Sequence, residues 1–337
     1  MKLRFVYLLT ILGLLSSSSL KAQDPQYSQF YSNLVMLNPA FTGSGIGPRV
    51  AMNYRAQWVK IPGYYRQFAA AYDQPISFLG TTQGLGVLVS NDVAGEGNLT
   101  KLNVTLNYAY QVDLNDDHTL RFGLSGGFIQ AGLDYSKLRF PDQIDPRLGF
   151  VFPTNEPGPA GGLSGNVFRP DVNAGVAYYN KYAWLGLSVH HITEPIEQFY
   201  TGQSLNPNIN AKLPRKITIT GGLNIPISEG RRGSREVSIT PAFLVKMQGE
   251  FTQVDGGLYV NAEPMVFGFW YRHQDALIGL IGVKTGPFSF GYSYDYTISD
   301  LSQAISGGSH EVAVVMEFET YKRKRRSKHR KMPCPRF

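Results

Sequence analysis

Alternation of hydrophobic and polar residues is the dominant pattern along this chain, and residues 101–111 (KLNVTLNYAYQ) show it most clearly. One face of that segment carries Leu102, Val104, Leu106, Tyr108 and Tyr110, and the other carries Lys101, Asn103, Thr105, Asn107, Ala109 and Gln111. A repeat of two residues is the spacing of a β-strand, whose successive side chains point to opposite sides of a sheet. The segment therefore predicts a strand with one face in apolar surroundings.

The same alternation in residues 288–296 (FSFGYSYDY) indicates what lies on each side of the sheet. Aromatic residues occupy one face, and the other face carries Ser289, Gly291, Ser293 and Asp295. A soluble β-sandwich usually exposes Lys and Glu, whereas the polar faces here are mostly Gly, Ser, Thr and Asn. Lipid outside and a polar lumen explain this pattern better. Arg in place of Tyr292 should then hinder membrane insertion, and Arg in place of Ser293 should be tolerated better.

Fourteen segments with this alternation can be counted. They are residues 49–57, 66–74, 82–90, 99–112, 119–131, 172–180, 182–191, 215–222, 235–247, 253–262, 266–273, 276–284, 287–297 and 311–319. An even number of strands is the rule in single-chain bacterial outer-membrane barrels. We therefore expect an all-β fold, a transmembrane antiparallel β-barrel of about 14 strands over residues 49–320.

The connections between these segments predict the orientation of the barrel. If the mature N-terminus is periplasmic, the two longest connections, 132–171 and 192–214, both lie outside the cell, as in other barrels of this kind. Long loops on a rigid scaffold commonly bind partners. The candidate contacts there are aromatic: Phe140, Phe150, Phe152, Phe168, Phe199 and Tyr200.

Composition and the first residues agree with an exported membrane protein. Only 17% of the 337 residues are charged, while 13% are aromatic. Residues 1–22 combine a basic start, an apolar stretch and small residues, which is typical of a secretory signal peptide. No run of 18 or more apolar residues follows, so insertion must be by strands. The single cysteine, Cys334, excludes a disulfide scaffold and a Cys-based metal site.

The end of the chain is strongly basic. Residues 322–337 contain nine Lys or Arg and no acid: Lys322, Arg323, Lys324, Arg325, Arg326, Lys328, Arg330, Lys331 and Arg336. With the predicted topology, residues 321–337 form a periplasmic tail, which removes nucleic acid as a partner. Two interpretations remain, a solvated extension held open by charge repulsion, or a tether to an acidic surface such as peptidoglycan or a periplasmic ring of a secretion apparatus.

Catalytic chemistry has little support in the sequence. The six His have no metalloprotease spacing, and we expect neither catalytic residues nor a metal or cofactor. His190 and His191 are adjacent in a predicted strand, so they should face opposite sides and could not share one metal.

Residues 24–44 (DPQYSQFYSNLVMLNPAFTGS) closely resemble the start of the PorP/SprF family of type IX secretion outer-membrane proteins. Further similar segments, including NYRAQW (53–58), GLSVHHITEP (186–195) and WYRHQDALIGLIG (270–282), follow in the same order along nearly the whole mature chain. The motif residues are Asp24, Gln26, Tyr27, Asn38, Pro39, Ala40, Tyr54, Arg55 and Trp58. The resemblance implies a barrel that serves the secretion and gliding machinery of Bacteroidetes-type bacteria, as a core component or as the partner of a secreted adhesin.

These observations leave two functions open. The first is a non-catalytic outer-membrane barrel that anchors a secreted cell-surface protein and links to periplasmic machinery. The alternative is an outer-membrane channel or transporter for small solutes, because a barrel of this size can leave a polar lumen. Residues 23–48 form a lead-in segment that either covers the base of the barrel or folds into the lumen as a plug.

Overall fold

The computed structural model describes residues 24–78, 80–153, 164–196, 212–228, 237–299, 301 and 303–318. The predicted signal peptide, the basic tail, Phe199 and Tyr200 lie outside the described residues.

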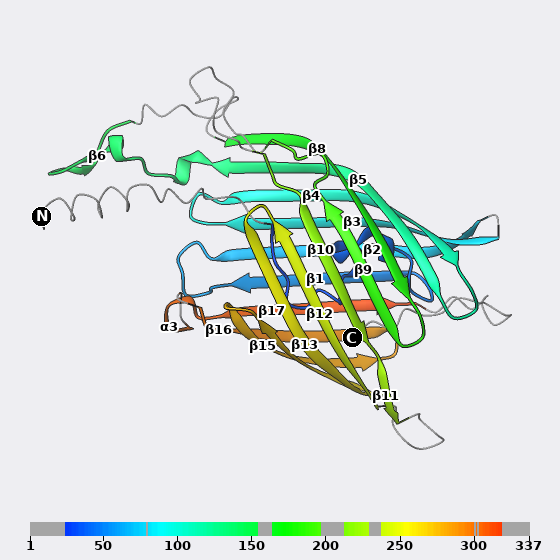
Figure 1. The fold of residues 1–337 in the computed structure, drawn as a ribbon. Helices are drawn as coiled ribbons and strands as arrows, with labels where there is room; N and C mark the ends of the chain where they lie inside the picture. The colour runs from blue at the N-terminus through cyan, green and yellow to red at the C-terminus, as the bar shows by residue number, and fades with distance from the viewer. Residues whose placement is uncertain are drawn as a thin grey trace, which may run out of the picture.

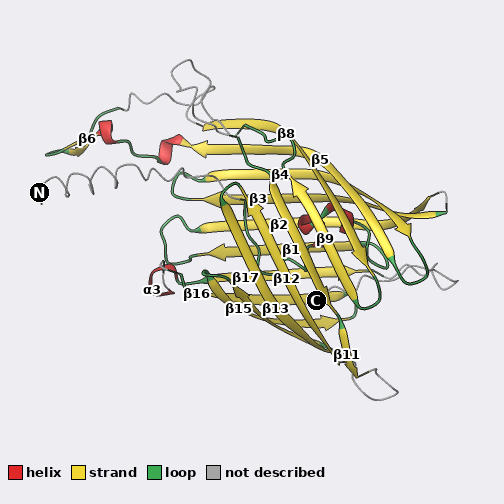
Figure 2. Ribbon diagram, in the orientation of Figure 1, coloured by secondary structure: helices red, strands yellow, loops and turns green. Residues whose placement is uncertain are grey.

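Fourteen antiparallel strands form a closed barrel, as predicted (Figures 1 and 2). They are β1 (Arg49–Gln57), β2 (Tyr65–Phe78), β3 (Thr81–Ala94), β4 (Leu99–Asp113), β5 (Thr119–Asp134), β8 (Ser164–Tyr179), β9 (Ala183–His190), β10 (Lys216–Leu223), β12 (Val237–Gln248), β13 (Phe251–Ala262), β14 (Met265–Arg272), β15 (Ala276–Thr285), β16 (Phe288–Thr297) and β17 (Ser309–Glu317). Each pairs with its neighbour in sequence, apart from short extra strands, and β1 pairs with β17 to close the wall. The short strand β11 (Ile225–Ser228) adds to β12, and β6 (Ile144–Asp145) pairs with β7 (Gly149–Phe150).

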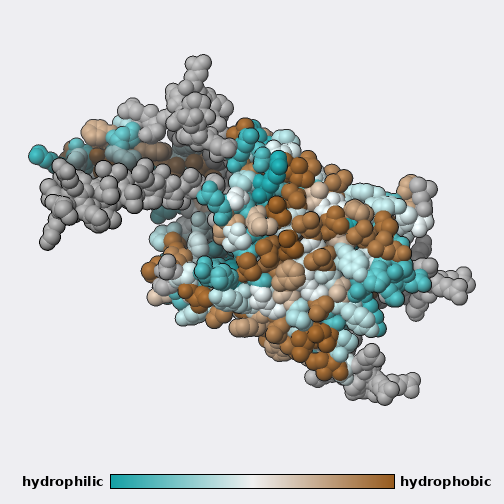
Figure 3. Space-filling view, viewed as in Figure 1, coloured by the Kyte–Doolittle hydropathy of each residue, from teal (hydrophilic) through white to brown (hydrophobic). Residues whose placement is uncertain are grey.

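The alternation in the sequence corresponds to the two faces of the wall. In β16 Tyr292 is 41% exposed, whereas its neighbour Ser293 is fully buried. Hydrophobic side chains cover the middle of the wall that faces the viewer in Figure 3. Strands with an apolar outer face and a polar inner face are what a bilayer requires. Ser293 is thus enclosed on the inner face, and the relative tolerance of Arg at Ser293 and Tyr292 stays a prediction.

The barrel has two distinct ends. The turn end carries the short connections around residues 79–80, 114–118, 180–182, 263–264 and 286–287, and β1 begins there. The loop end carries the connections 135–163 and 191–215, together with the short helix α3 (Gln303–Ser306). β5 and β8 pair as far as Asp134 and Ser164, so the first long loop is shorter than the predicted 132–171, and Phe168 lies on a strand.

Residues 24–48 lie inside the barrel. They form two short helices, α2 (Leu34–Leu37) and the 3₁₀ helix η1 (Pro39–Phe41), whose side chains belong to the main buried cluster. Figure 2 shows these helices in red behind the strands that face the viewer. Two more 3₁₀ helices, η2 (Tyr135–Lys137) and η3 (Pro141–Gln143), lie in the loop after β5. Among the described residues, none of the helices has the length and hydropathy needed to span a membrane.

Candidate functional site

The segment 24–48 fills the lumen and is called the plug below. Its apolar side chains Phe30, Tyr31, Leu34 and Phe41 are buried against the inner face of the wall. The ring of Phe30 meets that of Trp270 edge-on at 5.0 Å, and Tyr31 meets Trp184 edge-on at 5.9 Å. Edge-to-face aromatic pairs add about 0.5–1.5 kcal/mol each beyond the burial of their surface. The plug is therefore packed like a protein core, and not simply laid over the barrel base.

Polar groups of the wall hold the backbone of the plug. The amide of Asn38 donates to the carbonyls of Val176 and Leu187, both at 3.1 Å, and its Oδ1 accepts from Ala40 N at 2.8 Å. The guanidinium of Arg121 donates from Nε to the carbonyl of Ala40 at 2.9 Å and from Nη2 to that of Thr42. Buried backbone groups need such partners, since leaving one unpaired costs about 1–3 kcal/mol. One conformation of the plug is thereby specified.

Three glycines of the wall let the plug approach closely. A Cβ at Gly123 would lie 2.1 Å from the nitrogen of Ala40, and one at Gly84 would lie 1.9 Å from the carbonyl oxygen of Thr42. A Cβ at Gly175 would lie 2.0 Å from Oδ1 of Asn38. At Gly123 and Gly84 the neighbouring atoms belong to the plug backbone, and only glycine fits at so close an approach; at Gly175 they belong to the side chain of Asn38. The plug therefore explains why the wall has glycine at these positions.

A buried charge network joins the plug to four strands. Arg55 of β1 lies 2.8 Å from Asp295 and 3.5 Å from Glu311, and Arg272 lies 3.3 Å from Asp295. Ser28 of the plug sits among them: its Oγ donates to Asp295 at 2.6 Å, and its N–H donates to Glu311 at 2.7 Å. Removing one partner of a buried ion pair costs about 3–5 kcal/mol because a charge is left uncompensated. Ser28 of the plug thus supplies hydrogen bonds to two buried carboxylates of the wall.

At the turn end, a second ion pair fixes the last part of the plug. Arg49 lies 2.9 Å from Asp73, and the N–H of Gly43 donates to the same carboxylate at 2.7 Å. Gly43 has a φ of +64°, which glycine adopts without strain. The chain turns here from the lumen into β1.

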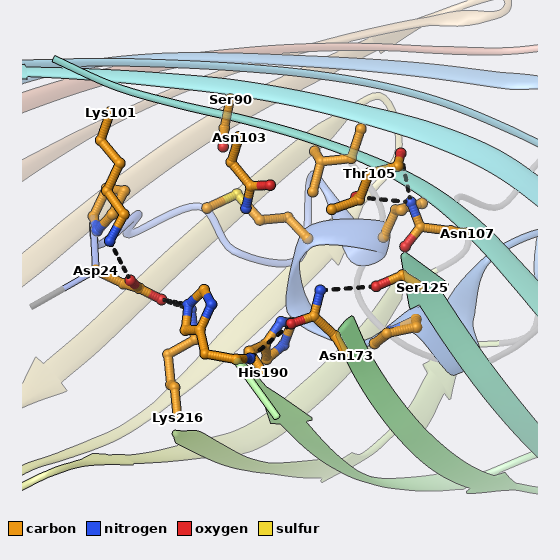
Figure 4. A pocket seen from close by; sticks show the side chains of 16 residues that line it. Asp24, Ser90, Lys101, Asn103, Thr105, Asn107, Ser125, Asn173, His190 and Lys216 are labelled. Carbon is orange, nitrogen blue, oxygen red and sulfur yellow. Dashed lines mark hydrogen bonds and ion pairs between the residues drawn. The ribbon is translucent and has the colours of Figure 1, made fainter. Parts of the chain in front are cut away.

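At its other end, the plug carries Asp24, which lies toward the loop end. Its carboxylate is 2.5 Å from Nζ of Lys216, 2.7 Å from Nε2 of His191 and 3.4 Å from Nζ of Lys101 (Figure 4). The other nitrogen of His191, Nδ1, lies 3.1 Å from Asp171. We call these five residues the Asp24 cluster. Burial by itself would raise the pKa of Asp24, but His191, Lys216 and Lys101 outweigh it and hold that pKa well below its ordinary value.

The same pairing acts on His191. Burial tends to lower its pKa, whereas the carboxylates of Asp24 and Asp171 raise it, and the net direction is upward. The expectation that His190 and His191 face opposite sides was wrong. β9 ends at His190, and His191 has a φ of +58°, so the chain turns and both rings are buried in the lumen. Their neighbours are plug atoms: the carbonyl of Leu37 for His190 and Asp24 for His191.

Small polar side chains surround the remaining space beside the Asp24 cluster. This cavity has a volume of about 40 Å³, enough for a few water molecules. Figure 4 shows the side chains of Asn103, Asn107, Ser125 and Asn173 around it. Within the described part of the chain, no group of three or more His, Cys, Asp or Glu is arranged to hold a metal ion.

A larger hollow of about 880 Å³ opens at the loop end above the start of the plug, and we call it the vestibule. Asp24, Pro25 and Gln26 contribute to its lining, as do the ends of β1 to β4 and the turns after β12 and β14. Trp58 lies on its wall, with its ring edge-on to that of Tyr65 at 5.4 Å. The plug thus fills the middle of the lumen, and the vestibule is the space left at the loop end.

The structure separates the predicted site residues into groups. Of the motif residues, Asp24, Tyr27, Asn38, Pro39, Ala40 and Arg55 lie in the plug or its contacts, Gln26 and Trp58 line the vestibule, and Tyr54 points outward with 46% exposure. Phe150 and Phe152 are exposed near η3, with Arg139 5.3 Å from the ring of Phe150. Phe168 is exposed on β8, where its ring packs against that of Phe128 at 5.8 Å.

Sequence reasoning missed the wall partners of the plug. Asp295 falls on the predicted polar face of residues 288–296, and Glu311 begins the predicted strand 311–319. Neither pattern indicates that these carboxylates contact Arg55 and Ser28. A signal was present: an acidic residue on the inner face of an otherwise uncharged strand needs a cation within reach. The pairing itself spans 240 and 256 positions of the sequence for Asp295 and Glu311, so no local pattern could identify Arg55.

One family model matches this sequence, over residues 19–316, and its description is type IX secretion system membrane protein PorP/SprF. No curated protein matches the chain in sequence.

Solved structures with a related outline are remote in sequence. The translocator domain of autotransporter NalP from Neisseria meningitidis is 13% identical, covering 81% of this chain and 88% of that chain, with a TM-score of 0.39. A FadL homologue of Pseudomonas aeruginosa is 11% identical, covering 80% and 90%, with a TM-score of 0.40. The TodX ΔS2S3 mutant, a monoaromatic hydrocarbon channel, is 10% identical, covering 83% and 92%, with a TM-score of 0.46. The barrel architecture itself rests on the strand pairing described above.

Proposed function

Because the chain belongs to the type IX secretion system membrane protein PorP/SprF family, we propose that it is a non-catalytic outer-membrane barrel that anchors an exported protein at its loop end. In this proposal the loop end faces the outside of the cell and the turn end faces the periplasm. The exported partner is a cell-surface protein such as an adhesin. Lipid of the outer membrane surrounds the apolar outer face of the strands.

The filled lumen is the observation that supports anchoring over solute conduction. The plug packs its aromatic side chains on Trp184 and Trp270 and closes its charges on Arg55, Asp295 and Glu311. A solute channel of this size would need a continuous polar path. A rigid closed barrel, in contrast, is a suitable scaffold for loops that bind a partner.

The aromatic side chains of the loop end are the proposed contacts with the exported protein. Phe150, Phe152 and Phe168 are each at least half exposed there. Phe199 and Tyr200 of the second long connection are further candidates by sequence. Exposed aromatic residues are enriched in protein interfaces because they bury much surface with few rotatable bonds.

The basic tail is the proposed link to the periplasm. Its residues Lys322, Arg323, Lys324, Arg325, Arg326, Lys328, Arg330 and Lys331 offer a dense positive charge to peptidoglycan or to an acidic face of a secretion ring component. β17 ends at Glu317 at the turn end, the same end at which β1 begins, and this supports a periplasmic tail in the proposed orientation.

Two measurements test this function together. Deletion of the protein from its native cells should reduce the amount of one exported protein retained on the cell surface. The purified barrel in planar bilayers should be closed to small ions. Normal surface retention in the deletion strain, together with steady conductance of the pure protein, would favour the channel instead.

A further inference from the structure

We infer that the vestibule is a binding site for a cationic segment of the anchored protein, an extended peptide that carries Lys or Arg. This inference rests on the proposed function, because it names the chemistry by which the exported partner is recognised. It begins from the size of the hollow. A volume of about 880 Å³ lies toward the upper end of the range of about 300–1,000 Å³ for ligand pockets, so it admits several residues of an extended chain.

The charge of the lining is the first argument. Four carboxylates border the vestibule, those of Asp24, Asp92, Glu250 and Asp275, against the cations Lys101 and Arg272. Asp24 is compensated by Lys101, Lys216 and His191, and Asp275 lies 3.4 Å from Arg272. The two further carboxylates, Asp92 and Glu250, make the lining negative. A concave surface lined by an excess of one sign concentrates ligands of the other sign. The vestibule therefore favours cations.

Unsatisfied acceptors are the second, independent argument. Oε1 of Gln67, Oδ1 of Asp92 and Oε1 of Gln253 are buried oxygens of the lining that accept no hydrogen bond. Gln67 and Gln253 are only 3% and 4% exposed. A buried acceptor without a donor is destabilising, and such groups in a cavity wall call for a ligand rich in donors. Ammonium groups, guanidinium groups and peptide N–H groups are such donors.

Aromatic surface is the third argument. Trp58, Tyr65 and Phe251 line the same hollow, and the edge-on contact between Trp58 and Tyr65 holds two of these rings in place. A cation over an aromatic face is attracted by the negative face of the ring, and more strongly when the cation is desolvated. Carboxylates, free carbonyl oxygens and aromatic rings together match Lys or Arg side chains on a peptide better than an acidic or a purely apolar segment.

Binding of synthetic peptides to the full-length purified barrel tests the inference. The probe is a short Gly-Ser peptide that carries lysines and arginines, compared with the same peptide with glutamine at those positions. Trp58 lies on the vestibule wall, so its fluorescence reports occupancy, and the Trp58→Phe variant identifies the contribution of Trp184 and Trp270. We expect saturable binding of the cationic peptide and at least about tenfold weaker binding of the neutral one.

Variants locate the site. Asp92→Asn combined with Glu250→Gln should weaken cationic peptide binding about tenfold or more, with the barrel still folded by its heat-modifiable migration. Asp117→Asn, in the connection between β4 and β5 at the turn end, is the matched control and should leave binding unchanged. Equal binding of both peptides, an equal effect of the two variants, or equally tight binding of free spermidine would each overturn the inference. If the deletion strain loses its surface protein but none of these peptides binds, the proposed function stands and this inference fails.

Discussion

Substitution of Gly123 by Ala should open the barrel by displacing the plug. The added Cβ would lie 2.1 Å from the nitrogen of Ala40 and 2.3 Å from the carbonyl carbon of Pro39, whereas ordinary contact begins at 3.4 Å. Both atoms belong to the backbone, so no side-chain rotation relieves the clash. The plug must move by more than about 1 Å where Arg121 holds the carbonyl of Ala40 at 2.9 Å.

The magnitude follows from two contributions. Overpacking a filled site costs about 1–3 kcal/mol, and loss of the Arg121 hydrogen bond costs about 1 kcal/mol more. A total near 3 kcal/mol raises the population with a displaced plug by about 100-fold, since 1.4 kcal/mol corresponds to a factor of ten. Even a small open fraction then becomes visible as single-channel events.

Planar bilayer recordings of the purified protein measure this effect. The matched control is Gly126→Ala on the same strand, because a Cβ there meets no atom within 4 Å. Gly123→Ala should show frequent openings, and the wild type and Gly126→Ala should stay closed. A chain that lacks residues 24–41 should be open already, so Gly123→Ala should add nothing to its conductance. Closed traces from a folded Gly123→Ala protein would refute the claim that the glycine is required by the plug.

Four further predictions follow from the contacts described above. Arg55→Met should lower the free energy of unfolding by about 3–5 kcal/mol, measured by urea titration of folded barrel, with Arg55→Lys recovering part of the loss. Tyr292→Arg should reduce the folded fraction in lipid by the equivalent of about 2–4 kcal/mol, whereas Tyr292→Phe should not. Because the folded pKa of His191 is raised, its attraction for Asp24 is complete in acid and is lost as the pH rises through that raised value. Labelling of a cysteine introduced beside Asp24 should therefore accelerate above that pH by more than the thiolate fraction of the cysteine accounts for, and this excess should be absent in His191→Asn. Truncation after Tyr321 should preserve heat-modifiable migration but weaken salt-sensitive co-purification with periplasmic partners; full retention of those partners would favour a solvated extension.

The fold could be predicted closely because each strand carries its own signal. Alternation in residues 101–111 and 288–296 needs only a lipid side and a lumen side, and the structure confirms both faces. The strand boundaries differ from the prediction where a strand extends beyond its alternating segment. β8 begins at Ser164 rather than near residue 172, because its first residues pair with the end of β5 and not because of their own pattern.

The site could be predicted only in part. The motif around Asn38 was recognised, but the placement of that segment in the lumen depends on partners far along the chain, such as Val176 and Leu187. The turn at His191 was missed because a left-handed residue directly after a strand has no periodic signature. Long-range pairs and single special dihedral angles are set by the assembled wall, which a local pattern does not describe.

The seam between β1 and β17 also sets an order of assembly. Ser28 and Gln29 precede the first strand, yet both donate their N–H groups to Glu311 in the last strand. Contacts between the two ends of the chain form late in folding, because closing so long a loop costs chain entropy before these contacts can stabilise the fold. A chain whose C-terminal strand has not arrived therefore lacks both the partner for its first residues and the strand that closes its wall. We therefore expect the wall to close only after residues 309–317 are delivered, so that lumen filling and wall closure depend on the same strand.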